Sequence, residues 1–598
     1  MKHIYAIMAV FFSAVLMANS APVFAQEVQE ARLYDISFLD KHERPHEAGL
    51  IGLNNRNLAA EAVSVSSSDI DMEALFNILG SLAKEEVSFN NMSGMELEIT
   101  ATPSGHKIIA GALANFKAIM SKRIEVSAWL MCVDSGVLEA IKAENAKLNA
   151  MVINDKQLDT LKSAGKWAEE FELVLNDCQR GITYSSRQVS FTGDYDAQLT
   201  QGSSAYSPVI EKYYEGVRLQ AVPFVALSGG MIRLDIGLLH SNLIGELEKF
   251  KTGYCGDIEL PEEDELAMAT SIMVPDGCTV IAGTVESSVH AGRDTVILLA
   301  HCRITGDNAK AKRIMSIAEA DGSIFSVYNT SALSAFIATA YSFPFEYTEL
   351  NDKAVSCVPP SADFETGMFF DKLRLAVDAD SEDSLSTDST RNFLVCSTNK
   401  ARMARIDSFM KEQEMISGRM VSVEAMYCRL PQQLYNDTIA PVERGKRAGL
   451  IMDAVSKNPE LKLASCSIQG FNKHVFGIHR LDNKRIVSDN DVIVGPNNFA
   501  YDSVIETVAQ GVALQVFPSI IEDGKRTGLD LDTAFRRFDK PMRVCEVNGS
   551  RYYQPAISEY KLDTRVVLEN NVWDYMVMPS ASVKDREYVF LLLKASVK

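Results

Sequence analysis

The sequence is poor in tryptophan and histidine, poor in positive charge, and free of long apolar runs after its first residues. Its three tryptophans, at positions 129, 167 and 573, are too few for the aromatic girdles of ordinary outer-membrane proteins. The 59 basic residues are outnumbered by 79 acidic ones, which gives a formal net charge of −20. Nucleic-acid binding needs a basic face that neutralises phosphates, so this balance argues against a nucleic-acid partner.

Sequence motifs of common catalytic and cofactor sites are absent as well. The chain has no Gly-x-Ser-x-Gly, no phosphate-binding loop and no dinucleotide fingerprint. His42 and His46 are four residues apart, but Pro45 disfavours the helix that would present both to a metal. His301 and Cys302 are neighbours in an expected strand, so they point to opposite faces and cannot form a nucleophile–base pair. We therefore expect no enzyme activity, no metal site and no cofactor.

Two acidic runs invite a calcium-binding interpretation. In the run at 378–383, Asp383 stands where an EF-hand needs glycine and Ser389 where it needs a bidentate glutamate. A solvated acidic loop fits these residues better, and the same interpretation is favoured for Glu259–Glu265.

The N-terminus is typical of an exported protein. Lys2, an apolar run over residues 4–17 and the small-residue pattern before residue 26 predict a secretory signal over residues 1–25. An uncleaved membrane anchor is the alternative. No later segment has the uninterrupted apolar length of a membrane helix.

Ten cysteines in an exported chain favour oxidised pairs. Cys132–Cys178 and Cys428–Cys466 are candidate disulfides because their positions recur in the two halves of the chain. Cys278 and Cys302 would face each other across an expected hairpin and form a third. Buried free thiols are the alternative, because sequence does not determine connectivity.

One stretch of the chain occurs twice. Residues 216–236 return as 511–531 without a gap, at an offset of 511 − 216 = 295, and each copy predicts a strand, a glycine turn and a strand. The shared residues include Gly216/Gly511, Leu219/Leu514, Pro223/Pro518, Gly229/Gly524, Leu234/Leu529 and Asp235/Asp530. Further matches at nearly the same offset are Thr270/Thr564, Asp276-Gly277/Asn570-Asn571 and Cys132/Cys428. This small drift predicts a tandem duplication, with the two prolines at equivalent edges or bulges and the two glycines in equivalent turns.

Each copy predicts an α+β segment followed by a β-rich one. In the first, a helix from Asp71 and a strand at 95–100 precede Thr102, an N-cap with Pro103 at the first helical position. A second helix and a strand at 123–133 follow. Asp276-Gly277 stands between two apolar runs, a pattern typical of a hairpin, and Asn570-Asn571 takes its place in the second copy.

These residues resemble the C-terminal domain of bacterial secretins, the ring-forming outer-membrane channels of type II and type III secretion and of type IV pili. The matching residues are Gly216, Leu219, Pro223, Leu234, Asp235, Ile236, Thr270, Ile272, Val274, Asp276, Gly277, Thr279, Val280, Ile281 and Gly283. The segment at 71–133 resembles the ring-building periplasmic domains that precede that region. Three features depart from the family. The Pro- and Gly-rich gate segment is replaced by polar loops at 286–293 and 579–587, the second copy lacks Asp-Gly, and one chain carries two units.

The resemblance implies an α+β fold class: two tandem repeats, each a small α+β ring-type domain followed by a β-rich secretin-like domain. The expected layout is a signal peptide (1–25), an N-terminal strand and Ser-rich linker (26–70), the first copy (71–133 and 134–304), a linker (305–339) and the second copy (340–430 and 431–598). The implied function is that of a non-enzymatic component of a secretion or pilus-type outer-membrane complex, in the periplasm or outer membrane. Its implied partners are copies of itself or other envelope secretion components. The alternative is a soluble periplasmic scaffold or binding protein that keeps the fold without forming a channel.

Overall fold

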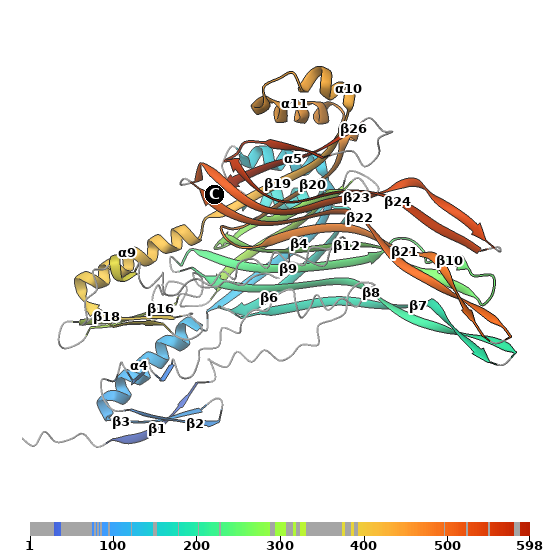
Figure 1. Cartoon of the computed structure of the whole chain (residues 1–598). Helices are drawn as coiled ribbons and strands as arrows, with labels where there is room; N and C mark the ends of the chain where they lie inside the picture. The colour runs from blue at the N-terminus through green and yellow to red at the C-terminus, as the bar shows by residue number, and fades with distance from the viewer. Residues whose placement is uncertain are drawn as a thin grey trace, which may run out of the picture.

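The protein is β-rich, with most of its strands in two large sheets that pack face to face (Figure 1). The computed structural model describes residues 29–36, 75–76, 79–80, 83, 87–93, 96–120, 122–146, 152–177, 179–200, 202–226, 229–287, 294–305, 315–318, 323–329, 373–376, 384–387, 393–495, 497–521, 524–547, 550–578 and 587–598. The expected signal peptide, the Ser-rich linker and the acidic run at 378–383 lie outside these residues. None of the helices in these ranges is both long and apolar enough to cross a membrane.

The first large sheet, here the long-strand sheet, has eight strands in the order β24-β23-β22-β21-β12-β9-β8-β7. All neighbouring strands are antiparallel. Several strands exceed 20 residues, and their far ends project as hairpins beyond the rest of the molecule (Figure 1, right). Their bounds are β7 Gly181–Thr200, β8 Ser203–Val225, β9 Met231–Leu243, β12 Glu262–Pro275, β21 Phe476–Val494, β22 Phe499–Ile521, β23 Arg526–Val547 and β24 Ser550–Glu569. A small hairpin of β10 (Glu248–Lys251) and β11 (Asp257–Leu260) separates β9 from β12.

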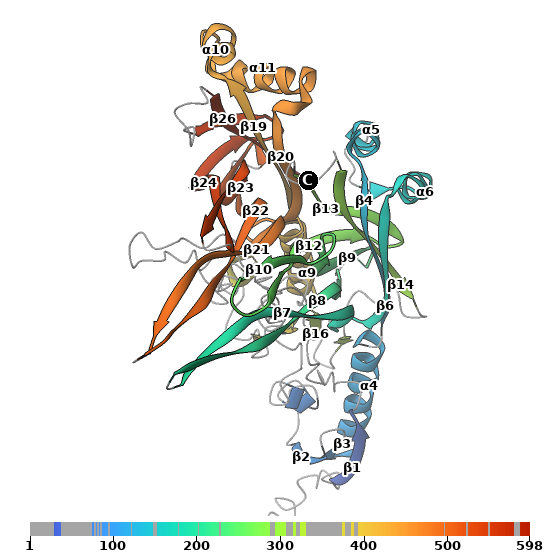
Figure 2. The ribbon, with the colours of Figure 1, turned by 90° about the vertical axis from the view of Figure 1, so that its right-hand side faces the viewer.

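The second large sheet, here the helix-covered sheet, has the order β25-β26-β19-β20-β13-β14-β4-β6, with β5 (Val152–Ile153) attached to β13. Its main strands are β4 Arg123–Asp134, β6 Trp167–Asn176, β13 Cys278–Ser287, β14 Asp294–Thr305, β19 Met420–Pro431, β20 Lys462–Phe471, β25 Asp574–Met578 and β26 Glu587–Val597. Its outer face carries α5 (Ser135–Ala146) and α6 (Asp155–Ala164) over one half, and α10 (Gln432–Leu434), the π-helix η2 (Tyr435–Ile439) and α11 (Arg444–Lys457) over the other (Figure 2).

The main core lies between the two large sheets, and strand alternation explains how it forms. In β4, Ile124, Val126 and Leu130 point into this core, while Trp129 and Met131 point to the helices on the opposite face. A strand buried on both faces lacks polar alternation, as in the run from Ala128 to Val133. Each fully buried aliphatic side chain stabilises the fold by about 1.5–3 kcal/mol.

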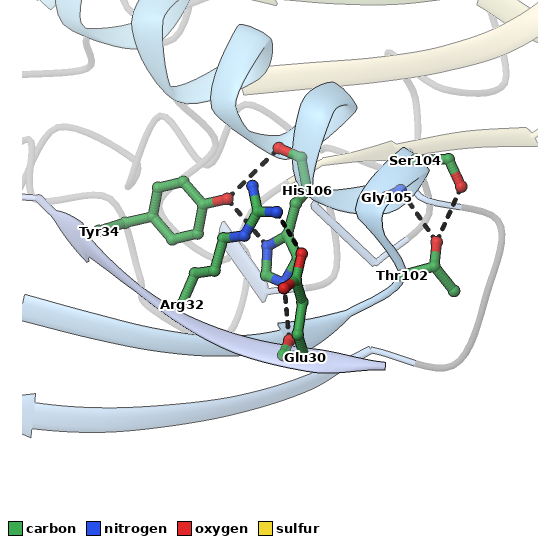
Figure 3. Close-up of polar contacts among 7 residues, drawn as sticks. All are labelled: Glu30, Arg32, Tyr34, Thr102, Ser104, Gly105 and His106. Atoms are coloured by element: carbon green, nitrogen blue, oxygen red, sulfur yellow. Dashed lines mark hydrogen bonds and ion pairs between the residues drawn. The ribbon is translucent and has the colours of Figure 1, made fainter. Parts of the chain in front are cut away.

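A small α+β unit precedes the large sheets. It consists of the sheet β1-β3-β2 (Glu30–Asp35, Glu96–Ala101, Ser88–Ser93) and helix α4 (Pro103–Met120). The predicted cap is confirmed, because the Thr102 hydroxyl accepts a hydrogen bond from the Gly105 amide (3.1 Å). His106 is fully buried and ties β1 to this helix (Figure 3): Nε2 donates to the Glu30 carbonyl (2.7 Å), and Nδ1 accepts from the Tyr34 hydroxyl (2.9 Å).

A second small unit precedes β19. Its sheet has the order β15-β16-β18-β17 (Met315–Ala318, Ser323–Asn329, Phe393–Asn399, Ser384–Thr387), and helix α9 (Lys400–Ser417) packs on it. The segment at 305–339, expected to be a linker, contains two strands, β15 and β16, which pair in this sheet. The predicted strand at 123–133 was expected to close the first small unit, and the second unit was expected to extend to residue 430. The strands at these positions, β4 and β19, lie in the helix-covered sheet instead, where β14 and β26 supply long-range partners that sequence does not reveal.

Candidate assembly interface

Both large sheets are joined in the same way from a first half (β4 to β14) and a second half (β19 to β26). In the long-strand sheet, β12-β9-β8-β7 belongs to the first half and β24-β23-β22-β21 to the second. In the helix-covered sheet, the corresponding sets are β13-β14-β4-β6 and β25-β26-β19-β20. The halves meet where β12 pairs with β21 and where β13 pairs with β20. We call these two strand pairs the seam.

Gly216 and Gly511 bring the first two long strands of each half together in the same way. Their φ angles are +150° and +141°, and a Cβ atom would lie 2.0 Å from the Ser185 carbonyl oxygen or 2.1 Å from that of Arg480. Only glycine tolerates this approach of one backbone to another. The two glycines therefore hold β7 against β8 and β21 against β22 at matching points.

The predicted equivalence of the prolines and turn glycines is confirmed. Pro223 lies opposite Leu234, and Pro518 lies opposite Leu529. Each proline lies past the end of the ladder on its other side, where no donor is needed. Gly229 and Gly524 have φ angles of +74° and +90° in the following turns.

The Asp276-Gly277 turn is not a hairpin, because β12 and β13 lie in different sheets. It is a corner between the sheets: the Asp276 carboxylate accepts a hydrogen bond from the Ile304 amide (2.7 Å). Asn570 makes the same contact to the Val597 amide (2.8 Å) at the corner between β24 and β25. Gly277 and Asn571 both adopt positive φ (+74° and +64°). The turn chemistry was predictable, but the destination of the strand was not.

The remaining motif residues divide between core and surface. Leu219, Leu514, Leu234 and Leu529 are fully buried between the sheets. Gly283 follows a bulge in β13. The paired motif residues Thr270/Thr564 and Asp235/Asp530 have different surroundings and are treated in turn.

Thr270 is buried and donates a hydrogen bond to the Gln469 carbonyl across the seam. Its match Thr564 lies half-buried on β24, the outermost strand of the sheet. The same residue type therefore joins the two halves at one place and reaches an open edge at the other.

Asp235 and Asp530 differ in burial. Asp235 is buried in the middle of β9 and pairs with Arg233 (3.1 Å), whose guanidinium lies between Phe224 and Phe471. Burial raises the pKa of Asp235, and the Arg233 charge opposes that shift. Asp530 is half-exposed and pairs across strands with Arg565 (3.1 Å). Asp235 therefore belongs to an internal ion pair, whereas Asp530 belongs to an ion pair at the surface.

The cysteines do not support the predicted pairing in the second half. Cys428 faces the helices, whereas Cys466 faces the main core, so their side chains point to opposite faces of one sheet and cannot bridge. Cys132 faces the core and is a free thiol, and Cys178 lies outside the described residues. Cys278 lies directly opposite Cys302, as predicted, with both thiols free.

In the long-strand sheet, the seam pairs an acidic strand with a basic one. The Arg480 guanidinium donates two hydrogen bonds to the Asp264 carboxylate (2.8 and 3.1 Å), a bidentate pair. His479 lies 3.0 Å from Glu265, and Lys484 lies 3.3 Å from Glu262. Over residues 262–265 of β12, the seam therefore brings acidic side chains to His479, Arg480 and Lys484 of β21, while Asp482 lies opposite Asp264.

Glu263 is a buried carboxylate near one end of this seam. It is 0% exposed and accepts hydrogen bonds from Asn483 (2.9 Å) and Ser241 (2.8 Å), and the Ser241 hydroxyl is bonded to that of Tyr213 (2.6 Å). A buried carboxylate is tolerated only with such partners. Much of the run at 259–265 is therefore a strand at an interface, which corrects the solvated loop expected from its composition.

Titration shifts follow from the same contacts. Burial lowers the pKa of Lys484, but hydrogen bonds and charges from Glu248 and Glu262 outweigh it, so the pKa is raised overall. Burial raises the pKa of Glu248, but hydrogen bonds from Tyr553 and Lys484 outweigh it, so the pKa is lowered overall. Both shifts favour the charged pair.

In the helix-covered sheet, the seam is shorter. Lys462 and Glu286 form an ion pair at 2.6 Å, with side chains 23% and 13% exposed. Gln469 donates to the Ile281 carbonyl, so a side chain of the second half satisfies a backbone group of the first. Together with Thr270, these contacts join the halves in both layers.

Among the described residues, four outer strands remain at the ends of the two sheets: β24 and β25 at one end, β7 and β6 at the other. Large apolar side chains are exposed on each of them. They are Val174 (64%) on β6, Tyr184 (51%) on β7, Ile557 (40%) and Val567 (51%) on β24, and Val577 (45%) on β25. An open edge with apolar side chains is a template for another strand.

Sequence reasoning missed the seam residues. The available signal was the basic set His479, Arg480, Lys484 and Arg485, which complements Glu262–Glu265, but charge alone does not show that these two segments, more than 200 residues apart, pair as strands. Within the described ranges, no group of three or more His, Cys, Asp and Glu residues could hold a metal ion.

Comparison with known proteins gives similarity to secretins at low identity. No protein-family model and no curated protein matches the chain. The secretin domain of InvG from the Salmonella SPI-1 injectisome is similar over 47% of this chain and 89% of that chain, with 11% identity and a TM-score of 0.26. The type II secretin GspD of enteropathogenic Escherichia coli is similar over 46% of this chain and 88% of that chain, with 10% identity and a TM-score of 0.24. The ETEC AspS–GspD pilotin–secretin complex covers 96% of this chain and 88% of that chain, with 8% identity and a TM-score of 0.21. At these values the functional argument rests on the chain's own residues and geometry.

Proposed function

We propose that the chain carries two copies of one unit and is a non-enzymatic, secretin-like component of a cell-envelope complex for protein secretion or pilus-type assembly. It works by joining strand edges. The observation that carries this proposal is the seam, where one half already meets the other edge to edge in both sheets. The outer strands β24 and β25 occupy in the second half the places that β12 and β13 occupy in the first.

The seam is heterologous, because the strands that meet in it are of different kinds. An interface of this type does not close on itself in a pair. It repeats head to tail and gives a ring or a filament. Edge-to-edge addition therefore supports a ring-shaped assembly for a chain whose motif residues resemble those of secretins.

The polar residues of the seam also support a structural role. On β12, Glu263 and Asp264 accept hydrogen bonds from Asn483 and Arg480 of β21. These polar side chains therefore bind the neighbouring strand. Their chemistry holds two strands together, which is the work expected of an assembly protein.

Envelope fractionation combined with unboiled gel electrophoresis and electron microscopy tests the proposal. We expect the protein in the outer-membrane fraction, as a high-mass species that resists mild detergent and forms rings. Extraction of a monomer alone, with no ring in the micrographs, would contradict the proposal.

A soluble periplasmic scaffold with the same fold is the second candidate. The Arg480–Asp264 and Lys484–Glu262 ion pairs of the seam are replaced by uncharged residues at the corresponding described positions of the outer edges, which favours a unit complete within one chain. This candidate predicts that a high-salt wash releases the protein from membranes as a monomer. Retention in the outer-membrane fraction after that wash would exclude it.

A further inference from the structure

We infer that β24 and β25 pair with β7 and β6 of a second copy of this chain, in the register that the seam sets. The inference rests on the proposed function and names the partner and the residues in contact. A strand that adds to an open edge gains a full ladder of backbone hydrogen bonds, and side-chain pairs determine its register.

The register follows from matching contacts in the two halves. Gly216 approaches the Ser185 carbonyl as Gly511 approaches that of Arg480, so Ser185 of β7 corresponds to Arg480 of β21. Thr270 lies opposite Ile236, as Thr564 lies opposite Leu531. Each residue of β12 therefore corresponds to the residue of β24 that is 564 − 270 = 294 positions later.

Transfer of the seam register gives specific contacts between two copies. Glu265 lies opposite Leu481 in the seam, which places Glu559 of one copy opposite Ser186 of the next. By the same rule Ala556 lies opposite Val189, and Lys561 lies opposite Tyr184. No like charges face each other in this ladder, which would otherwise destabilise it.

In the helix-covered sheet the transferred register pairs apolar residues. Gly283 lies opposite Ile468 in the seam, and Val285 lies opposite Cys466. The matching corners at Asp276 and Asn570 align β14 with β26. From this alignment, the ladders make Met576 and Met578 of β25 equivalent to Gly283 and Val285 of β13. They also make Leu173 and Phe171 of β6 equivalent to Ile468 and Cys466 of β20. Met576 therefore meets Leu173, and Met578 meets Phe171.

The side chains at the outer edges differ from those of the seam. Asp264 and Arg480 correspond to Ser558 and Ser185, and Glu262 and Lys484 correspond to Ala556 and Val189. The contact between copies thus has no net charge, since Arg187 and Lys561 balance Glu559 and Asp563, whereas the contact within the chain is built on ion pairs. A strand that carries the acidic set of β12 matches the basic set of β21 better than β7, whose ladder segment carries only Arg187. The ion pairs of the seam therefore select the partner within the chain and leave the outer edges for a second copy.

Exposure on the outer edges agrees with this occupant. Ile557 and Tyr184 are 40% and 51% exposed, and both lie within the transferred ladder. β24 is 20 residues long, and within the ladder its only lysine is Lys561. Natural edges that stay unpaired are usually shortened or carry charge and proline.

Disulfide trapping tests the register in the full chain. Two differently tagged variants, Glu559→Cys and Ser186→Cys, are co-expressed, extracted with mild detergent and oxidised. We expect a covalent dimer that carries both tags and a linked peptide joining positions 559 and 186. Glu559→Cys with Gln188→Cys is the matched control, because position 188 is two residues away on the same face and out of bridging range. A ring that cross-links 559 to 188, or 559 to 559, overturns the register and leaves the proposed function intact. Absence of any assembly contradicts both.

A charge test distinguishes contact from a folding defect. Ser186→Glu would face Glu559 of the next copy, so we expect at least a tenfold loss of the assembled species, and we expect Glu559→Gln in the same chain to restore it. Ser190→Glu adds the same charge to β7 beyond the ladder and should assemble normally. Equal losses for Ser186→Glu and Ser190→Glu, or no recovery with Glu559→Gln, would overturn the inference.

Discussion

At the scale of single residues, the chain is governed by a few positions where backbone geometry allows one residue type. The glycines and prolines of the repeated stretch were predictable because their constraint is local: a positive φ or a missing donor acts where the residue stands. The cysteines were not predictable in the same way. Cys132 and Cys428 match at an offset of 296 in sequence, yet one faces the core and the other the helices. A slip of one residue in alignment reverses the face of a strand residue.

Gly216→Ala and Gly511→Ala should each destabilise the protein by about 3 kcal/mol, because the backbone is strained and the new Cβ meets a carbonyl oxygen. Urea unfolding followed by circular dichroism measures this loss. Gly230→Ala is the control, since a Cβ atom added there would have no neighbouring atom within 4 Å and the φ angle is not positive. A loss below about 1 kcal/mol at both glycines would show that the approach of the strands is not required.

His240 should make stability fall in mild acid. It is buried between the sheets, stacks on Trp167 (5.1 Å between ring centres) and is bonded to Asn242 (2.9 Å). Burial lowers its pKa in the folded state, whereas the unfolded chain binds a proton near about pH 6.5. Stability is therefore complete above about pH 6.5 and is lost as the pH falls below it, by at most about 1.4 kcal/mol per pH unit. Unfolding in urea at a series of pH values measures how the free energy of unfolding depends on pH. Below about pH 6.5 this free energy should fall less steeply for His240→Phe than for the unchanged protein. An equally steep fall in both proteins would exclude this role of His240.

At the scale of elements, the sequence pattern identified the strands at 95–100 and 123–133, those of the repeated stretch and the capped helix α4, but it did not identify their partners. The Asp276-Gly277 turn has the chemistry of a hairpin, yet it turns a corner between two sheets. The acidic run at 262–265 has the composition of a solvated loop, yet it is part of strand β12 and pairs with β21 in the seam. In each case the deciding contact comes from a distant strand, whose position depends on the packing of the whole sheet.

Arg480→Ala should destabilise the protein by about 3 kcal/mol, because it leaves the Asp264 carboxylate without its bidentate partner in a largely buried seam. Lys446→Ala is the control, since its ion pair with Glu443 is about three-quarters exposed and should contribute less than about 1 kcal/mol. Thermal and urea unfolding of both variants measure the difference. Equal effects of the two substitutions would show that the seam does not depend on this charge pair.

At the scale of the whole molecule, two halves with the same strand order are joined head to tail, and the outer edges keep the same polarity. Further copies of such a chain can be added head to tail through the same kind of strand pairing that joins its two halves. Each chain would then supply two units to the assembly, with contacts built on ion pairs inside chains alternating with contacts of no net charge between them.

The most direct test of this arrangement is to count units and chains in the same particle. The assembly is extracted in mild detergent, its native mass gives the number of chains, and electron-microscopic class averages give the number of units around the ring. We expect a closed ring with twice as many units as chains. A particle with one unit per chain, or a protein that remains monomeric under these conditions, would contradict it.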